Sequence, residues 1–278
     1  MIMAMTIVAL CAASCGSKKE ESRTLVLYYS LTGNTKMVAE EIANRLGADI
    51  EAIEAVNPYD TNFQACIARS MQEREQGITP EIKALKSDLS KYDVIFIGYP
   101  VWFGTYAPPI ITFLANNDLT GKKLVPFCTF GSGGLESSAK DLVNAQPNAQ
   151  VMPGYGVRAA RLEAMPQEVD QFLKINGFLD GEFFQPEDFP EQHEVSTDEA
   201  AIFDAAVDGY PMLHAHATTV AQRSLANGTE YLFTALDESR PNDPDVSDST
   251  VKLPPLGELQ VYVTVANGQA PVFTKVVR

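Results

Sequence analysis

The sequence predicts an α/β fold in which a doubly wound parallel sheet is followed by a second, smaller α+β domain. From Arg23 onward, short apolar runs alternate with amphipathic segments, which is the pattern of repeated strand–helix–strand units. This pattern stops near Phe178. The charge changes at the same place, because residues 1–178 carry a net charge of −3 and residues 179–278 carry −12. The length of 278 residues also exceeds one typical domain of roughly 150 residues.

Five strands and six helices are expected in the first part of the chain. Continuous apolar runs predict buried strands over residues 24–29, 94–97 and 124–128, and weaker patterns predict an edge strand over 48–55 and a fifth strand near 151–157. The helical spacing of Val38, Ile42 and Leu46 predicts a first helix after Asn34. Further helices are expected near residues 63–75, 80–89, 109–116, 135–145 and 166–176.

The composition restricts the kind of partner and cofactor. Hydrophobic residues make up 45% and charged residues 21%, which is ordinary for a globular chain, and a net charge of −15 argues against nucleic acid as a partner. The four cysteines are Cys11, Cys15, Cys66 and Cys128, and their irregular spacing fits neither a disulfide framework nor a C-x-x-C metal or redox site. No metal is therefore expected.

The N-terminus has the features of a targeting segment. Residues 1–13 are almost wholly apolar but too few to span a bilayer as a helix. Ala12, Ala13, Ser14 and Cys15 resemble the lipobox at which bacterial lipoprotein precursors are lipidated and cleaved. We therefore expect residues 1–22 to be a signal and tether, with lipidation at Cys15 and a location in the bacterial cell envelope. No Lys or Arg precedes Cys15, and the alternative is an apolar arm that packs on the domain.

The most informative segment lies between the first predicted strand and the first helix. It reads Ser30, Leu31, Thr32, Gly33, Asn34, Thr35. Unpaired N–H groups and the positive end of the dipole make a helix N-terminus an anion site, to which three hydroxyls add donors. Gly33 lets the backbone approach a phosphate closely. The alternative is a Ser/Thr-rich capping segment without a ligand.

This loop is neither a P-loop nor a G-x-G-x-x-G dinucleotide motif. It resembles the phosphate loop of the flavodoxin family, which reads Thr/Ser-x-Thr-Gly-x-Thr directly after the first strand. The resemblance extends over residues 23–178 and implies an FMN-binding domain with a five-stranded sheet of order 2-1-3-4-5. Ligands in such a sheet bind at the carboxyl ends of the strands, and flavodoxin is a standard example of that rule.

Two more loops match the places where this family holds the flavin ring. The first contains the single tryptophan of the chain, whose ring could stack on the flavin or, alternatively, plug the end of the sheet. The second is glycine-rich and implies backbone N–H donors for the pyrimidine edge of the ring. The cofactor-binding residues implied by the resemblance are Pro100, Val101, Trp102, Phe103 and Gly104 in one loop and Thr129, Phe130, Gly131, Ser132 and Gly133 in the other.

The rest of the chain predicts a linker and a second domain. Residues 179–195 are acidic and interrupted by prolines, which is typical of a linker. Within residues 196–278 we expect a helix over 197–207 and antiparallel strands over 217–225, 229–236, 257–266 and 270–277. Asn227-Gly228 and Asn267-Gly268 are the expected hairpin turns.

The run from Ala221 to Phe233 resembles a hairpin of the cystatin fold, which implies one helix packed on four antiparallel strands. Ser224 stands where cystatins carry an inhibitory Gln, so inhibition of cysteine proteases is not expected. His214 and His216 alternate along a predicted strand, but two histidines without a third ligand do not predict a zinc site.

Three functions remain open at this point. The first is a membrane-anchored, FMN-binding electron-transfer protein that serves a redox partner protein or a small-molecule electron acceptor. The second is an NAD(P)H-dependent quinone or nitro reductase that uses the same FMN. The third is a surface lipoprotein that binds a protein or glycan without flavin chemistry. No catalytic side chain is assigned, because a bound flavin would carry the chemistry in the first two cases.

Overall fold

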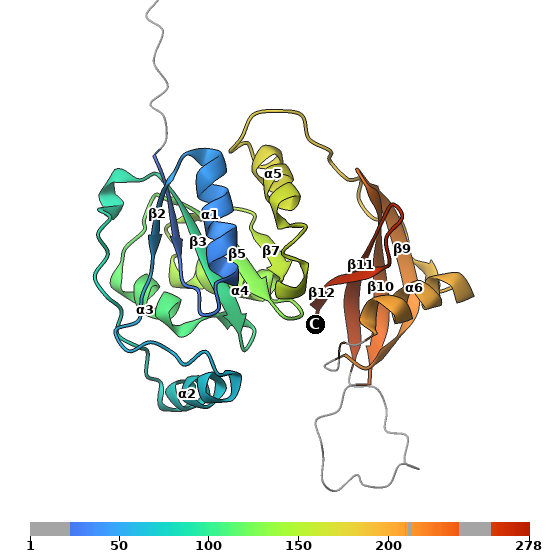
Figure 1. The fold of residues 1–278 in the computed structure, drawn as a ribbon, viewed down its shortest axis with the longest axis horizontal. Coiled ribbons are helices and arrows are strands. Elements are labelled where there is room, and N and C mark those ends of the chain that lie inside the picture. The colour runs from blue at the N-terminus through green and yellow to red at the C-terminus, as the bar shows by residue number, and fades with distance from the viewer. Residues whose placement is uncertain (1–22, 209, 211–212, 239–256) are drawn as a thin grey trace, which may run out of the picture.

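A computed structural model describes residues 23–208, 210, 213–238 and 257–278, and these form two sheets with their helices (Figure 1). The predicted signal and tether, including Cys15, lies outside the described residues. In the described part of the chain, no helix is both long enough and apolar enough to cross a membrane.

The first sheet confirms the predicted parallel architecture. Its order is β2-β1-β3-β5-β6, which corresponds to 2-1-3-4-5 when the strands of the main path are numbered along the chain. The last position is shared, because β6 and β7 both pair with β5 and are separated by Met152 to Gly154. A short strand, β4, pairs antiparallel with the end of β3. The strands are β1 (Thr24–Tyr28), β2 (Asp49–Ala52), β3 (Val94–Trp102), β4 (Thr105–Tyr106), β5 (Lys123–Phe130), β6 (Gln150–Val151) and β7 (Tyr155–Arg158).

Helices cover both faces of this sheet because alternate strand residues point to opposite sides. On one face, Val26 and Phe96 lie in a core with residues of α1 (Asn34–Leu46) and α5 (Met165–Ile175). On the other face, Leu25 and Ile95 lie in a core with residues of α3 (Pro108–Asn116) and α4 (Leu135–Ala145). The central strands are therefore buried on both sides, which explains their continuous apolar sequences.

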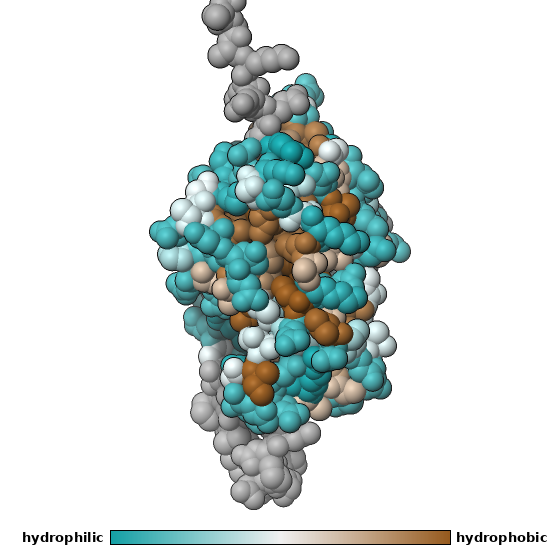
Figure 2. Space-filling model, turned by 90° about the vertical axis from the view of Figure 1, so that its left-hand side faces the viewer, coloured by the Kyte–Doolittle hydropathy of each residue, from teal (hydrophilic) through white to brown (hydrophobic). Residues whose placement is uncertain are grey.

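The helix α2 (Phe63–Gln76) buries few of its residues. Only Cys66 and Ser70 of this helix are buried, and the Phe63 side chain is 72% exposed. Figure 2 shows the side of the domain that carries β2, α2 and α3, where apolar residues form a band inside a hydrophilic surface.

The expected helix over residues 80–89 is wrong. This segment instead runs beside the chain that follows β2, with an isolated bridge between Ala55 and Ile82. The Glu51 carboxylate accepts hydrogen bonds from the amides of Lys86 and Ser87 at 2.7 and 2.8 Å. A single short 3-10 turn, Leu89–Lys91, follows. These long-range contacts use backbone groups that a helix would have paired internally.

The second sheet is antiparallel, with the order β12-β11-β10-β9-β8, and one helix, α6 (Thr197–Val207), packs on it. Ser196 and Glu199 form a capping box at the start of α6. The predicted strands are all present, and β8 is an additional strand that lies in the expected linker. The resemblance of the second domain to the cystatin fold stays a prediction. The strands are β8 (His193–Glu194), β9 (Ala215–Leu225), β10 (Gly228–Asp237), β11 (Glu258–Ala266) and β12 (Val272–Val277).

The two sheets are in contact through β12. This strand is at the edge of the second sheet and lies beside β7 of the first (Figure 1). Its contacts reach the loop after β5, which is one of the predicted cofactor loops.

Candidate flavin site

Three loops meet at the carboxyl edge of the first sheet. The parallel register aligns Tyr28 of β1 with Gly98 of β3, and Gly98 with Phe127 of β5, so these strands end close together. The residues predicted to bind the cofactor lie at the ends of these strands, in the loops that follow them and at the start of α1. Chain topology alone therefore brings together segments separated by about a hundred residues.

The first loop, residues 30–34, opens the helix α1. Gly33 is the N-cap residue with a φ of 94°, and no side chain caps the helix. The Ser30 hydroxyl accepts a hydrogen bond from the Gly33 amide at 3.1 Å, which closes the loop. The backbone N–H groups of the first turn of α1 have no carbonyl acceptor within the helix. The first turn also contains no acidic side chain that would repel an anion. These donors and the helix dipole suit a phosphate group.

Thr35 and Thr129 lie beneath the loops. Thr35 is 1% exposed and Thr129 is 4% exposed, and their hydroxyls form a hydrogen bond of 2.8 Å. This bond ties the start of α1 to the end of β5, and so fixes the first loop relative to the third. A direct contact of either hydroxyl with a ligand stays a prediction.

The second loop is a tight hairpin. Trp102 pairs with Thr105, which leaves Phe103 and Gly104 as the two central residues, with φ values of 52° and 82°. Two positive φ angles define a type I′ turn, for which Asn-Gly is the favoured sequence. Phe103 is the only residue other than glycine with positive φ in the described part of the chain, and its side chain is 49% exposed. A bulky residue in this conformation stores backbone strain, which is a feature of functional loops.

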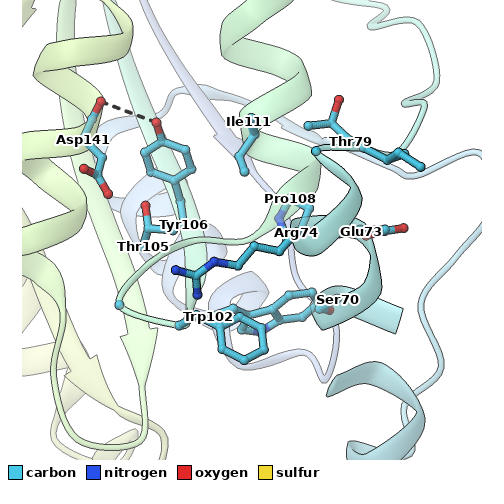
Figure 3. A pocket seen from close by; sticks show the side chains of 14 residues that line it. Ser70, Glu73, Arg74, Thr79, Trp102, Thr105, Tyr106, Pro108, Ile111 and Asp141 are labelled. Carbon is cyan, nitrogen blue, oxygen red and sulfur yellow. Dashed lines mark hydrogen bonds between the residues drawn. The ribbon is translucent and has the colours of Figure 1, made fainter. Parts of the chain in front are cut away.

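Trp102 is held by two tyrosine rings. Its ring lies edge-on to Tyr59 at 5.2 Å and to Tyr29 at 6.0 Å between centroids. The partly buried indole also borders a cavity of about 410 Å³ between α2, the hairpin and α3 (Figure 3). Arg74 extends from α2 across this cavity, and its guanidinium lies 5.8 Å from the Phe103 ring. Trp102 is thus fixed in direction and is not buried in the core.

A second cavity of about 500 Å³ borders the first loop. It is lined by Tyr29, Ser30, Gly33 and Lys36, and on its other side by the segment that follows β2, including Tyr59. The Tyr59 hydroxyl donates to the Glu73 carboxylate, and the Arg69 guanidinium lies 3.9 Å from the Tyr59 ring. These contacts anchor α2 beside the site.

The third loop is fixed from outside. Arg158, the last residue of β7, donates from Nε to the Gly131 carbonyl at 2.8 Å, and the Val276 amide of β12 donates to the Ser132 carbonyl at 2.7 Å. The loop also contacts the hairpin, because a Cβ at Gly134 would lie 2.6 Å from Val101 Cγ1. A cavity of about 710 Å³ lies between the two loops and the end of the chain, with walls formed by Val101, Phe103, Gly104, residues 130–134, part of α4 and residues 276–278.

The tyrosine and cysteine side chains around the loops stay uncharged at neutral pH. Burial raises the pKa of Tyr29 and of Tyr59, and the hydrogen bond to Glu73 raises that of Tyr59 further. Burial also raises the pKa of the Cys66 and Cys128 thiols, so neither is an activated nucleophile. No group of three or more His, Cys, Asp or Glu side chains able to hold a metal occurs among the residues that the structure describes.

The structure brings the three predicted loops together, and sequence reasoning missed the residues that support them. Arg158, Val276 and Arg74 belong to this group. Arg158 carries a weak signal, because it is a basic residue at the carboxyl end of a strand in this sheet. No local pattern marks Val276, since its role depends on how the second domain docks.

Comparison with known proteins agrees with this geometry. The profile of the flavodoxin family matches residues 23–170. The chain belongs to the flavodoxin family. Membership of this family supports FMN as the cofactor.

Three relatives illustrate how far the similarity reaches. A candidate flavoprotein from Bacteroides eggerthii DSM 20697 is 30% identical, with a TM-score of 0.50, over 56% of this chain and 98% of its own. A flavoprotein in complex with FMN from Lactobacillus acidophilus NCFM is 25% identical, with a TM-score of 0.44, over 49% and 93%. NAD(P)H dehydrogenase (quinone) 3 of Rhizobium meliloti (strain 1021) is 33% identical over 129 residues, which span 42% of this chain and only 58% of that relative.

Proposed function

We propose that the protein binds FMN at the three loops and transfers electrons through it to a redox partner protein or a small-molecule acceptor. One observation carries this proposal. The uncapped N-terminus of α1, with Gly33 in a left-handed conformation, opens at the carboxyl edge of the sheet beside the hairpin and the glycine-rich loop. An anion site next to two loops with aromatic and amide groups fits a phosphorylated flavin.

The residues present fit FMN in their donor chemistry. The Ser30 and Thr32 hydroxyls and the amides of the first turn of α1 would hold the phosphate. Trp102 would offer an aromatic face or edge to the ring, and the amides of the 131–133 segment would donate to its carbonyl oxygens. When bound, FMN supplies reversible one- or two-electron transfer.

The side chains around the ring position have no acid–base role in this proposal. The neighbouring tyrosines are held neutral by burial, and the cysteines are held as thiols. The chain itself would bind the cofactor, orient it and shield part of it from water. These are the tasks of a protein whose cofactor carries the chemistry.

The phosphate loop provides the direct test. The double substitution Ser30→Ala and Thr32→Ala removes two hydroxyls, so FMN binding should weaken by roughly tenfold or more, as expected for the loss of hydrogen bonds to a charged group. Thr120→Ala is the matched control. Its hydroxyl donates to Asp118 at 2.6 Å before the start of β5, at the opposite edge of the sheet. Equal FMN affinity in the double variant and the control would contradict the proposed phosphate site.

The reductase is a second candidate, favoured by the cavity of about 410 Å³. Trp102, Phe103, Tyr106, Pro108 and Ile111 give it largely apolar walls, which suit a flat aromatic acceptor such as a quinone. The name of the Rhizobium meliloti relative points in the same direction. Anaerobic mixing of the FMN-loaded protein with NADH or NADPH separates the two functions. Rapid bleaching of the flavin absorbance supports a reductase, and an unchanged spectrum supports the electron carrier.

Membrane anchoring is part of the proposal and rests on the sequence around Cys15. The expected result is incorporation of labelled fatty acid when the full chain is made in a bacterial host, with loss of the label in Cys15→Ser. A surface lipoprotein without flavin chemistry remains the alternative if the lipid is present but FMN does not bind.

A further inference from the structure

The edge of the second sheet reaches directly into the third loop. The Val276 amide of β12 donates to the Ser132 carbonyl at 2.7 Å. Arg158 bridges the two domains, because its Nε donates to the Gly131 carbonyl at 2.8 Å and its Nη1 donates to the Phe273 carbonyl of β12 at 2.7 Å. The same guanidinium lies 4.1 Å from the centroid of the Phe273 ring. Lys275 adds an ion pair with Glu136 at the start of α4.

These two carbonyl bonds fix the direction of the loop amides. In a trans peptide, the C=O and the following N–H point in opposite directions. Because Arg158 and Val276 engage the carbonyls of Gly131 and Ser132, the amides of Ser132 and Gly133 point away from these partners. These amides belong to the loop that would donate to the flavin ring.

The backbone of Gly133 lies too close to β12 of the second domain to leave room for a side chain. A Cβ at this position would lie 2.2 Å from the Val276 carbonyl oxygen, a distance that forces a shift of β12. Its φ angle is not in the left-handed region, so the backbone conformation itself does not require glycine. The close approach of β12 therefore explains this glycine, whereas the left-handed conformations of Gly33 and Gly104 explain theirs.

The cavity of about 710 Å³ is shared by both domains. Its first wall contains Val101, Phe103 and the 130–134 loop, all within the predicted flavin site or directly beside it, and another wall is formed by residues 276–278. The first domain alone therefore leaves this cavity without one of its walls.

We propose that the C-terminal domain is a positioning element of the flavin-ring site. In this proposal, β12 and Arg158 hold the carbonyls of Gly131 and Ser132 so that the adjacent amides stay aimed at the ring, and residues 276–278 close one side of the cavity. This inference rests on the proposed FMN-binding function, and it assigns a task to the second domain.

The substitution Val276→Pro tests the key hydrogen bond. Proline removes the amide donor, and an edge strand tolerates proline where its N–H faces away from the ladder. Val276→Ala is the matched control, because it also removes the buried isopropyl group but keeps the amide N–H. We expect Val276→Pro to bind FMN about fivefold to tenfold more weakly than Val276→Ala, the size of one lost hydrogen bond. Hydrogen exchange in the cofactor-free protein should become faster over residues 130–135 in Val276→Pro alone.

Gly133→Ala probes the same contact from the loop side and leaves the sequence of β12 unchanged, so it tests the proposal if Val276→Pro fails to fold. Equal FMN affinity and equal exchange in Val276→Pro and Val276→Ala, or wild-type values in Gly133→Ala, would overturn the positioning role. Failure of the wild-type protein to bind FMN would instead overturn the proposed function. In that case, the exchange experiment would still report whether β12 orders the loop.

Discussion

The first and third loops of the candidate site are stabilised in different ways. The first loop closes on itself through the bond from the Gly33 amide to the Ser30 hydroxyl, three residues apart, and continues directly into α1. The third loop takes its carbonyl partners from Arg158, 27 residues from Gly131 in the chain, and from Val276 in another domain. The contact that closes the first loop lies within its own short motif, whereas the partners that fix the third loop from outside cannot be read from the sequence of that loop.

The largest effect is expected from a substitution that disrupts the first loop. Gly33→Val places a β-branched residue at a φ of 94°, which should cost roughly 1–3 kcal/mol of unfolding free energy and weaken FMN binding by about two orders of magnitude. Gly47→Val is the control, because Gly47 ends the same helix with a φ of 59° and open space around its Cβ position. Similar destabilisation in both variants, with weakened FMN binding only in Gly33→Val, would confirm the local site.

The third loop should respond to a change in its distant support. Arg158→Ala leaves the carbonyls of Gly131 and Phe273 without their donor, and we expect the free energy of unfolding to fall by about 2 kcal/mol. Lys83→Ala removes an exposed ion pair with Glu54, and we expect it to change the free energy of unfolding much less than Arg158→Ala does. Urea unfolding of the three proteins measures both values. A change in Arg158→Ala no larger than that in Lys83→Ala would mean that the interdomain bridge adds no stability.

In the hairpin between these two loops, we expect a substitution that raises the free energy of unfolding to weaken FMN binding or electron transfer. Phe103→Asn places the residue preferred in a type I′ turn at a position of positive φ, so the free energy of unfolding should rise by about 1 kcal/mol. FMN binding or electron transfer should weaken if the exposed ring serves the site. Thermal unfolding and FMN titration of the same variant measure the two effects. A variant that is more stable and equally active would show that the strain at Phe103 has no functional purpose.

The smallest expected effect is a change in the free energy of unfolding that appears only above pH 10. Tyr106 joins the hairpin to α4 through a hydrogen bond from its hydroxyl to the Asp141 carbonyl at 3.4 Å, and burial raises its pKa from 10.0 to about 12. Since the pKa is higher in the folded state, Tyr106 contributes fully to the free energy of unfolding below pH 10, and this contribution is lost as the pH rises through 12. By pH 11 the free energy of unfolding should have fallen by about 1 kcal/mol through this group. The unfolding free energy of Tyr106→Phe should therefore fall less steeply over this range than that of the wild type, and parallel curves would contradict the shift.

The sequence was informative wherever the structure depends on local pattern. The buried strands over 24–28 and 94–97 follow from continuous apolar runs, and α1 follows from the spacing of Val38 and Ile42. The prediction of a helix over residues 80–89 was wrong because the conformation of this segment depends on long-range contacts with Glu51 and Ala55. The same limit applies to the site, where residues 30–35 form a recognisable motif but the approach of Val276 to Ser132 depends on the docking of two domains.

Flavin binding is most directly tested by the visible spectrum of the protein purified without added cofactor, followed by titration with FMN while Trp102 fluorescence is recorded. We expect oxidised-flavin bands and quenching of the tryptophan fluorescence at micromolar or lower FMN, because Trp102 borders the proposed ring position. Absence of both bands and quenching at high FMN would contradict flavin binding and favour the protein- or glycan-binding lipoprotein.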